Sequence, residues 1–185
     1  MLYRVTIDGA ESRDFDDAVA VQERPKGGFR LFGHIADVSH FVDPRGVLDD
    51  EARRRGTSVY FPDRVFPMFP ERISNDLCSL REGVERLAFS VRFRVGPNGH
   101  IKKVEANRSV IHSRRRCTYD EVFEWLERPR AEWHEATAPF ADSLELLAEA
   151  AAFFGDVLGD RLDALGENPG GVVIGRKKGA QPVYL

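Results

Sequence analysis

The sequence predicts an α+β fold, in which helices pack against a mixed β-sheet. Several segments alternate apolar and polar residues with the two-residue period of strands, which predicts the sheet. Two of these segments flank a Gly-Pro-Asn-Gly turn that is typical of a hairpin. The segment 139–165 has the apolar spacing and the Ala, Leu and Glu content of a long helix. The chain has 185 residues, 42% of them hydrophobic, and can therefore bury a core as one domain.

The first three predicted strands follow one another closely. Residues 3–7 and 18–22 alternate enough to form short strands, and an acidic loop joins them. Residues 25–28 read Pro-Lys-Gly-Gly, which is a turn sequence. We therefore expect a third strand over residues 29–35.

The middle of the chain combines a helix, a loop and a hairpin. A short helix is predicted over residues 47–55, and Gly56 ends it. Residues 61–70 contain three prolines, which a helix interior or a central strand does not tolerate, so an extended loop is expected. Residues 87–95 and 101–112 alternate cleanly and predict the clearest hairpin of the sequence.

Two helices and a different tail follow the hairpin. Residues 119–127 are predicted to be helical, with Thr118 as the N-cap. The long helix over 139–165 comes next and would end the ordered domain, residues 1–165. Residues 166–185 are rich in glycine and contain two prolines. We expect this tail to be a divergent or truncated ending.

The composition excludes several classes of protein. No stretch is long and apolar enough to cross a membrane and no signal peptide is visible, so no membrane association is expected. Cys78 and Cys117 lack metal-ligand spacing and are interpreted as reduced thiols of a cytoplasmic protein. The net charge of −3 excludes a general polyanion binder. Basic residues nevertheless gather at Arg53–Arg55 and Arg114–Arg116, where they either bind phosphates or form solvated faces.

An acidic cluster near the N-terminus is the strongest functional signal. Four carboxylates this close repel one another unless a cation compensates them, and hard oxygen ligands suit Mg²⁺ or Mn²⁺. The second and third aspartates alternate on an extended backbone and can point the same way. A solvated acidic loop is the alternative. The four residues are Asp8, Asp14, Asp16 and Asp17.

Two known aspartate motifs do not explain this loop. Counted from Asp14, an EF-hand needs Gly at its sixth position and Glu at its twelfth, but Val19 and Pro25 stand there. A phosphatase-type Asp-x-Asp-x-Thr nucleophile directly follows a strand, whereas residues 11–13 intervene here and Ala18 replaces the Thr. A cage for one or two divalent ions remains as the hypothesis.

The chain resembles a known family, the catalytic (RNB) domain of ribonuclease II and ribonuclease R. The resemblance covers residues 3–127 without an obvious gap, so residues 1–165 are interpreted as the N-terminal part of such a domain. Family members are much longer, and their catalytic domain continues past position 185. The blocks that carry the resemblance are Thr6–Ala18, His34–Val42, Leu48–Leu80, the hairpin and Arg108–Val122.

The resemblance implies a Mg²⁺-dependent 3′→5′ exoribonuclease that hydrolyses single-stranded RNA to nucleoside 5′-monophosphates. Asp16 corresponds to the aspartate most closely tied to catalysis. Tyr60 matches an aromatic residue that packs on a base near the 3′ end, and Tyr119 matches a second tyrosine of the RNA channel. Without the resemblance, either tyrosine is more simply a packing or surface residue. The implied metal ligands are Asp8, Asp14, Asp16 and Asp17.

Two hypotheses stay open at this stage. The chain is either part of an active exoribonuclease domain or a catalytically incompetent RNA- or metal-binding remnant. His34 and His40 flank Asp37, but their position in and after a strand favours a structural role over catalysis. Apolar surface that the rest of the domain would cover also predicts self-association of the chain.

Overall fold

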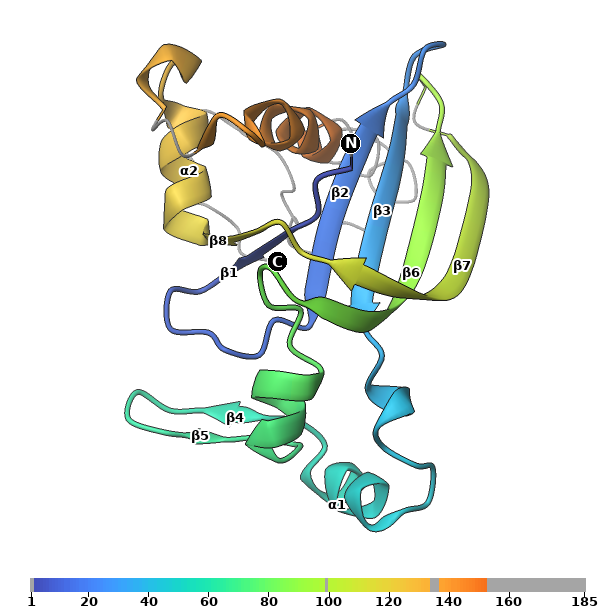
Figure 1. Cartoon of the computed structure of the whole chain (residues 1–185), viewed down its shortest axis with the longest axis vertical. Coiled ribbons are helices and arrows are strands. Elements are labelled where there is room, and N and C mark those ends of the chain that lie inside the picture. The colour runs from blue at the N-terminus through green and yellow to red at the C-terminus, as the bar shows by residue number, and fades with distance from the viewer. Residues whose placement is uncertain (1, 99, 134–136, 153–185) are drawn as a thin grey trace, which may run out of the picture.

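The computed structural model describes residues 2–98, 100–133 and 137–152. A six-stranded sheet dominates it, in the order β7-β6-β3-β2-β1-β8 (Figure 1). The pair β1 and β8 is parallel and the other pairs are antiparallel, so the sheet is mixed. The strands are β1 (Val5–Asp8), β2 (Asp17–Glu23), β3 (Phe29–Ala36), β6 (Glu85–Val95), β7 (Ile101–His112) and β8 (Arg115–Thr118).

The predicted fold class and hairpin are confirmed, and one strand of the six-stranded sheet was missed. Strands β6 and β7 pair along their whole length, with a shift in register between Arg94 and Val95. The three N-terminal strands lie where the alternation places them. Strand β8 was not predicted because its sequence, Arg-Arg-Cys-Thr, does not show an apolar alternation. It forms because the main chain can extend the sheet beside β1, with Val5 opposite Arg115.

Both short helices have the predicted bounds. Helix α1 (Val47–Arg55) ends at Gly56, which has a φ of 76° that glycine adopts without strain. Helix α2 (Tyr119–Glu127) is capped by Thr118, whose hydroxyl accepts from the N–H of Glu121. Residues 141–152 are helical, which agrees with part of the predicted long helix. The rest of that prediction and the tail 166–185 lie outside the described residues.

The prediction of a plain loop over residues 61–70 was wrong in part. Strand β5 (Val65–Phe66) pairs with β4 (Val59–Tyr60) in a two-stranded ribbon. Pro62 and Pro67 lie outside these strands, so they do not interrupt the pairing. Three further turns were not predicted, η1 (Val38–His40), the π-helical η2 (Arg72–Leu77) and η3 (Arg130–Glu132).

Two buried clusters support the sheet. One contains Phe15 together with Cys78 and Leu80, and it anchors the acidic loop. The other contains Val5 and Cys117, with Phe140 and Leu144 from the C-terminal segment packed against them. Both cysteines are buried free thiols, as predicted. Among the described residues, no helix has the length and hydropathy that crossing a membrane requires.

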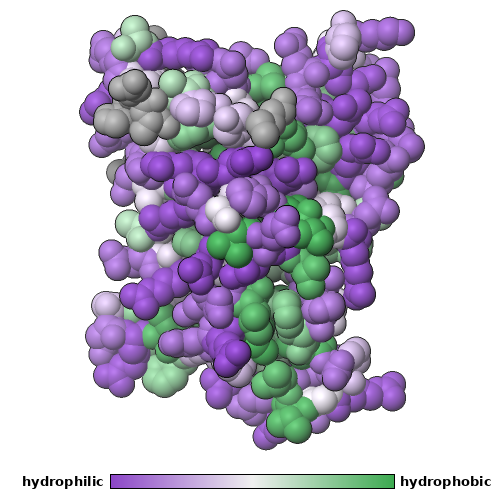
Figure 2. All heavy atoms as spheres, viewed as in Figure 1, coloured by the Kyte–Doolittle hydropathy of each residue, from purple (hydrophilic) through white to green (hydrophobic). Residues whose placement is uncertain are grey.

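Part of one sheet face is apolar and exposed. Ile35 pairs with Phe89 on this face, and Val104 and Val110 lie on the same side of β7. These four side chains are 45–59% exposed. Figure 2 shows further hydrophobic side chains toward the bottom of the view, where Figure 1 places α1, β4 and β5.

Candidate active site

The acidic loop connects two neighbouring strand ends. Strand β1 ends at Asp8 and its antiparallel partner β2 begins at Asp17, so both residues lie at the same edge of the sheet. Asp14 and Asp16 belong to the loop between them. The loop is only eight residues long, and Phe15 in the core holds its middle. The fold therefore gathers all four predicted aspartates in one region.

The aspartates affect one another electrostatically. Desolvation raises the pKa of Asp16, a backbone hydrogen bond opposes this, and the charges of Asp8 and Asp14 raise it further. Desolvation also raises the pKa of Asp17, and repulsion from Asp16 and Asp8 adds to it. A bound cation would relieve this repulsion.

The carboxylates share a region without forming a closed ligand shell. Among the described residues, no group of three or more His, Cys, Asp or Glu side chains has a spacing that would hold a metal. Asp8 accepts from the N–H of Gly9 at 2.8 Å, and Asp14 accepts from the hydroxyl of Tyr60 at 2.6 Å. Their oxygen donors and mutual repulsion fit Mg²⁺ or Mn²⁺, and closing the shell would require side-chain rotation.

Ser79 fixes the loop backbone on both sides of Asp14. Its hydroxyl donates to the carbonyl of Arg13 at 2.7 Å and accepts from the N–H of Phe15 at 3.2 Å. The N–H of Leu80 donates to the carbonyl of Phe15 at 2.8 Å. Ser79 is fully buried. No pattern in the sequence indicated this role, although Ser79 lies in a block that resembles the family.

Arg116 holds the first half of the loop. Its guanidinium donates to the carbonyls of Gly9 at 2.9 Å and Ala10 at 2.7 Å. The guanidinium carbon also lies 5.4 Å from the centre of the Phe15 ring. The sequence offered phosphate binding or a solvated face for this residue. The structure shows a third role, because the guanidinium binds the main chain of the acidic loop.

The other basic residues of these two clusters are mostly paired with carboxylates. Arg53 lies 3.1 Å from Asp49, and Arg55 lies 2.9 Å from Glu51 on the same helix. Arg115 lies 3.6 Å from Glu121. These pairs favour a solvated face over phosphate binding.

Both predicted tyrosines border the aspartates. Tyr60 is 62% exposed, and its hydrogen bond to Asp14 raises its pKa to about 12, so the hydroxyl stays protonated. Tyr119 begins α2, and desolvation followed by the charges of Asp8 and Asp17 raises its pKa. Base stacking by either ring stays a prediction.

The histidines and Asp37 stand apart from this region. Asp37 is buried, accepts from the hydroxyl of Ser39 at 2.6 Å and lies 3.3 Å from Arg108. His34 bonds through Nδ1 to Ser90, and the ring of His40 contacts Phe41 edge-on. These contacts agree with structural roles.

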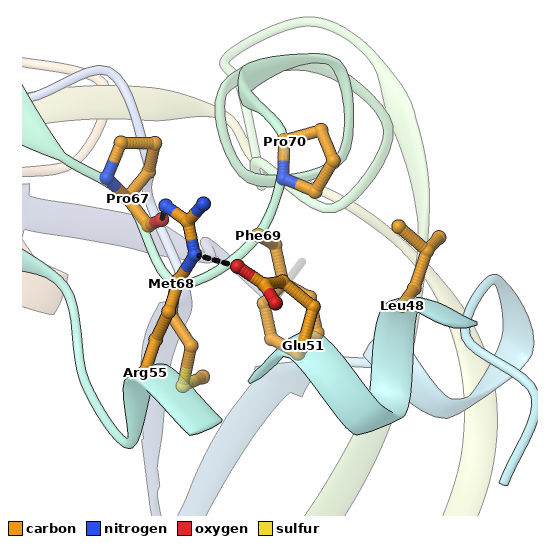
Figure 3. A pocket seen from close by; sticks show the side chains of 7 residues that line it. All are labelled: Leu48, Glu51, Arg55, Pro67, Met68, Phe69 and Pro70. Atoms are coloured by element: carbon orange, nitrogen blue, oxygen red, sulfur yellow. Dashed lines mark hydrogen bonds and ion pairs between the residues drawn. The ribbon is translucent and has the colours of Figure 1, made fainter. Parts of the chain in front are cut away.

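A small pocket shows how the ribbon that carries Tyr60 is supported. The pocket, of about 120 Å³, lies between α1 and residues 67–70 (Figure 3). Arg55 forms its polar wall, where it pairs with Glu51 and donates to the carbonyl of Pro67 at 2.9 Å. Because these polar groups already have partners, the contact attaches the end of β5 to α1.

The comparison with protein families decides the classification. The RNB domain matches residues 2–156. The chain belongs to the RNB domain family. Ribonuclease R of Thermotoga maritima is 41% identical over 187 residues, which cover 95% of this chain and 26% of the relative. Ribonuclease R of Escherichia coli is 46% identical and covers 77% of this chain and 18% of the relative. The chain thus spans about a quarter or less of these curated relatives.

Two solved structures share the fold. Mycoplasma genitalium RNase R in complex with double-stranded RNA aligns with a TM-score of 0.76 at 32% identity, over 88% of this chain and 28% of that chain. Yeast Ssd1, a pseudonuclease, aligns with a TM-score of 0.69 over 83% of this chain and 18% of its own. Because the two sequences are only 21% identical, this match shows a shared fold and no more. The partial RNB-type α+β domain predicted from the sequence is thereby confirmed.

Proposed function

We propose that the chain is the N-terminal part of a Mg²⁺-dependent 3′→5′ exoribonuclease domain that hydrolyses single-stranded RNA to nucleoside 5′-monophosphates, with Mn²⁺ as a substitute ion. The observation that carries the proposal is the gathering of four aspartates between two adjacent strand ends of an RNB domain. A cytoplasmic location belongs to the proposal, since free buried thiols suit a reducing compartment.

The residues of the site would have different roles in metal binding and RNA binding. The four aspartates would hold the cation, and Asp16 is exposed on a loop whose backbone is fixed on both sides. When bound, Mg²⁺ supplies Lewis acidity for phosphodiester hydrolysis. The protonated hydroxyl of Tyr60 orients Asp14. The rings of Tyr60 and Tyr119 offer stacking surfaces for bases, which tolerate any sequence.

Release of nucleoside monophosphates from RNA tests the proposal. The purified chain is incubated with 3′-labelled single-stranded RNA and Mg²⁺, beside Asp16→Asn and a control, Arg53→Gln. We expect Asp16→Asn to lower the release by about 100-fold or more, because it removes several kcal/mol of charge stabilisation. Arg53→Gln should match the parent, since the one ion pair of Arg53 in the described residues is with Asp49 on the surface of α1.

The same experiment distinguishes an active exoribonuclease domain from a catalytically incompetent remnant. Binding of RNA or metal without release of monophosphate would support the catalytically incompetent remnant. Release that persists in Asp16→Asn would refute the assignment of the aspartates.

We also propose that the chain self-associates through the apolar sheet face defined by Ile35, Phe89, Val104 and Val110, because these neighbouring side chains are about half exposed. Gel filtration should show an apparent mass that rises with concentration. The variant Phe89→Ser should reduce this rise, and a monomeric parent at high concentration would contradict the proposal.

A further inference from the structure

A polar groove on the sheet is distinct from the aspartate site. It has a volume of about 240 Å³, roughly eight times the volume of a water molecule in the liquid. It is lined by neighbouring residues of β3, β6 and β7 and by a residue that precedes β1, and none of the four aspartates reaches it. The residues that matter here are Arg4, His34, Ser90, Arg92, Glu105 and Ser109.

His34 lines this groove, and its Nε2 has no hydrogen-bond partner in the described residues. The hydroxyl of Ser109 donates to the carbonyl of Ala88 at 3.2 Å, so its single proton is used. In the tautomer consistent with this bond, Ser90 donates to Ser109 at 2.5 Å and Nδ1–H of His34 donates to Ser90 at 2.5 Å. Burial, followed by the charge of Arg4, lowers the pKa of His34 to about 4, so the ring is neutral. Its Nε2 is therefore an acceptor.

This acceptor lacks a partner in the described part of the chain. The side chain of His34 is only 3% exposed, and Nε2 is shielded from solvent without a hydrogen bond. A buried polar atom of this kind costs stability unless a ligand or water satisfies it.

Arg4 supplies positive charge beside His34. Its Nε is shielded from solvent and has no hydrogen-bond partner in the described residues. Desolvation and repulsion from Arg114 lower its pKa, and no ion pair of Arg4 with a carboxylate is seen in the described residues. Arg92, by contrast, already donates to Glu105 through Nη2 at 2.5 Å. The groove thus combines an uncompensated cation with an unpartnered acceptor.

We propose that this groove binds one ribonucleotide unit of an RNA strand, with a phosphate at Arg4. A shift of the side chains around His34 exposes Nε2, and the ribose 2′-hydroxyl then donates to this nitrogen. An anion alone would satisfy Arg4, but the unpartnered nitrogen requires a donor. The 2′-hydroxyl lies beside the 3′-phosphate in RNA and is absent from DNA. The choice of RNA rests on the proposed function, whereas the requirement for an anion beside a donor rests on the groove.

Binding in EDTA tests this site separately from hydrolysis. We would measure fluorescence anisotropy with labelled oligo(A) and oligo(dA) at pH 7.5. The parent should bind RNA about fivefold more tightly than DNA, the value of one hydrogen bond. Arg4→Gln should weaken both by about tenfold, as expected for loss of a charged donor. His34→Phe should abolish the preference for RNA while DNA binding stays unchanged.

Two controls keep the result specific. Arg53→Gln, on α1, should bind as the parent does, and urea unfolding of each variant checks the fold. Asp16→Asn should keep the RNA preference in EDTA even if hydrolysis fails, so the two proposals can fail independently. Equal binding of RNA and DNA by the parent, or a preference that survives His34→Phe, would overturn the site. Competition by free 3′-AMP as strong as by oligo(A) would overturn its assignment to a strand.

Discussion

The acidic loop and the basic groove are built in opposite ways. In the loop, carboxylates repel one another, and Ser79 and Arg116 bind the backbone from distant parts of the chain. In the groove, most of the backbone belongs to regular strands, while a side-chain nitrogen of Arg4 and one of His34 have no hydrogen-bond partner in the part of the chain that the structure describes. The loop therefore needs support from outside residues to keep its carboxylates together, whereas the groove needs a ligand to satisfy its side chains. Variants in the loop should therefore lower stability more than variants in the groove.

Among these variants, a change at Ser79 should lower the free energy of unfolding most. Ser79→Ala leaves the carbonyl of Arg13 and the buried N–H of Phe15 without partners, and should lower the free energy of unfolding by about 2 kcal/mol or more. Urea unfolding measures the change. Ser12→Ala is the matched control. It removes a hydroxyl from the acidic loop itself, and this hydroxyl makes no hydrogen bond in the described residues. Equal losses in both variants would show that Ser79 does not hold the loop.

Arg116 should have the next largest effect. Arg116→Gln removes the donors to Gly9 and Ala10, and we expect a loss of about 1.5 kcal/mol in the free energy of unfolding. The affinity for Mn²⁺ should also fall, because the loop carries the proposed ligands. Arg114→Gln removes a neighbouring exposed charge as the control. Loss of a positive charge alone would raise the Mn²⁺ affinity, so a higher affinity in both variants would point to general electrostatics instead of loop support.

Thr118 connects β8 to the helix that begins at Tyr119. Thr118→Ala removes the cap to the N–H of Glu121 and should lower the free energy of unfolding by about 1 kcal/mol. Thr118→Ser should retain most of the stability, because Ser caps as well as Thr. Thermal unfolding followed by circular dichroism compares them, and a loss in the Ser variant as large as in the Ala variant would contradict the capping role.

Replacing His34 should change the stability of the chain least at neutral pH and more in acid. Its pKa is about 4 in the folded chain and 6.5 in its unperturbed state, so the unfolded chain binds the proton first as the pH falls. The urea midpoint of the parent should therefore decrease between pH 6.5 and 4. His34→Phe should flatten this part of the profile. Parallel profiles would mean that His34 does not contribute to it.

Local patterns allowed much of the fold to be predicted. The alternation of β6 and β7, the glycine after α1 and the cap at Thr118 depend on neighbours in the sequence, and each was recognised. The two-stranded ribbon and β8 were missed because two to four residues carry too little pattern.

The missed features of the two sites depend on distant partners. Ser79 bonds to Phe15 across 64 residues, and Arg116 bonds to Gly9 across 107. The donors and acceptors in the hydrogen bonds of His34 depend on side chains from three strands that pair side by side. Residue types showed where the carboxylates were, but they could not show which groups hold the loop or which nitrogen lacks a partner.

Mn²⁺ binding shows whether the four aspartates form a cation site. Isothermal titration at neutral pH compares the parent with Asp16→Asn and with Arg4→Gln, which changes the groove alone. If the aspartates form the cation site, the parent binds Mn²⁺, Asp16→Asn binds it about tenfold or more weakly, and Arg4→Gln matches the parent. Equal affinity of the parent and Asp16→Asn, or a parent that binds no Mn²⁺, would contradict the account.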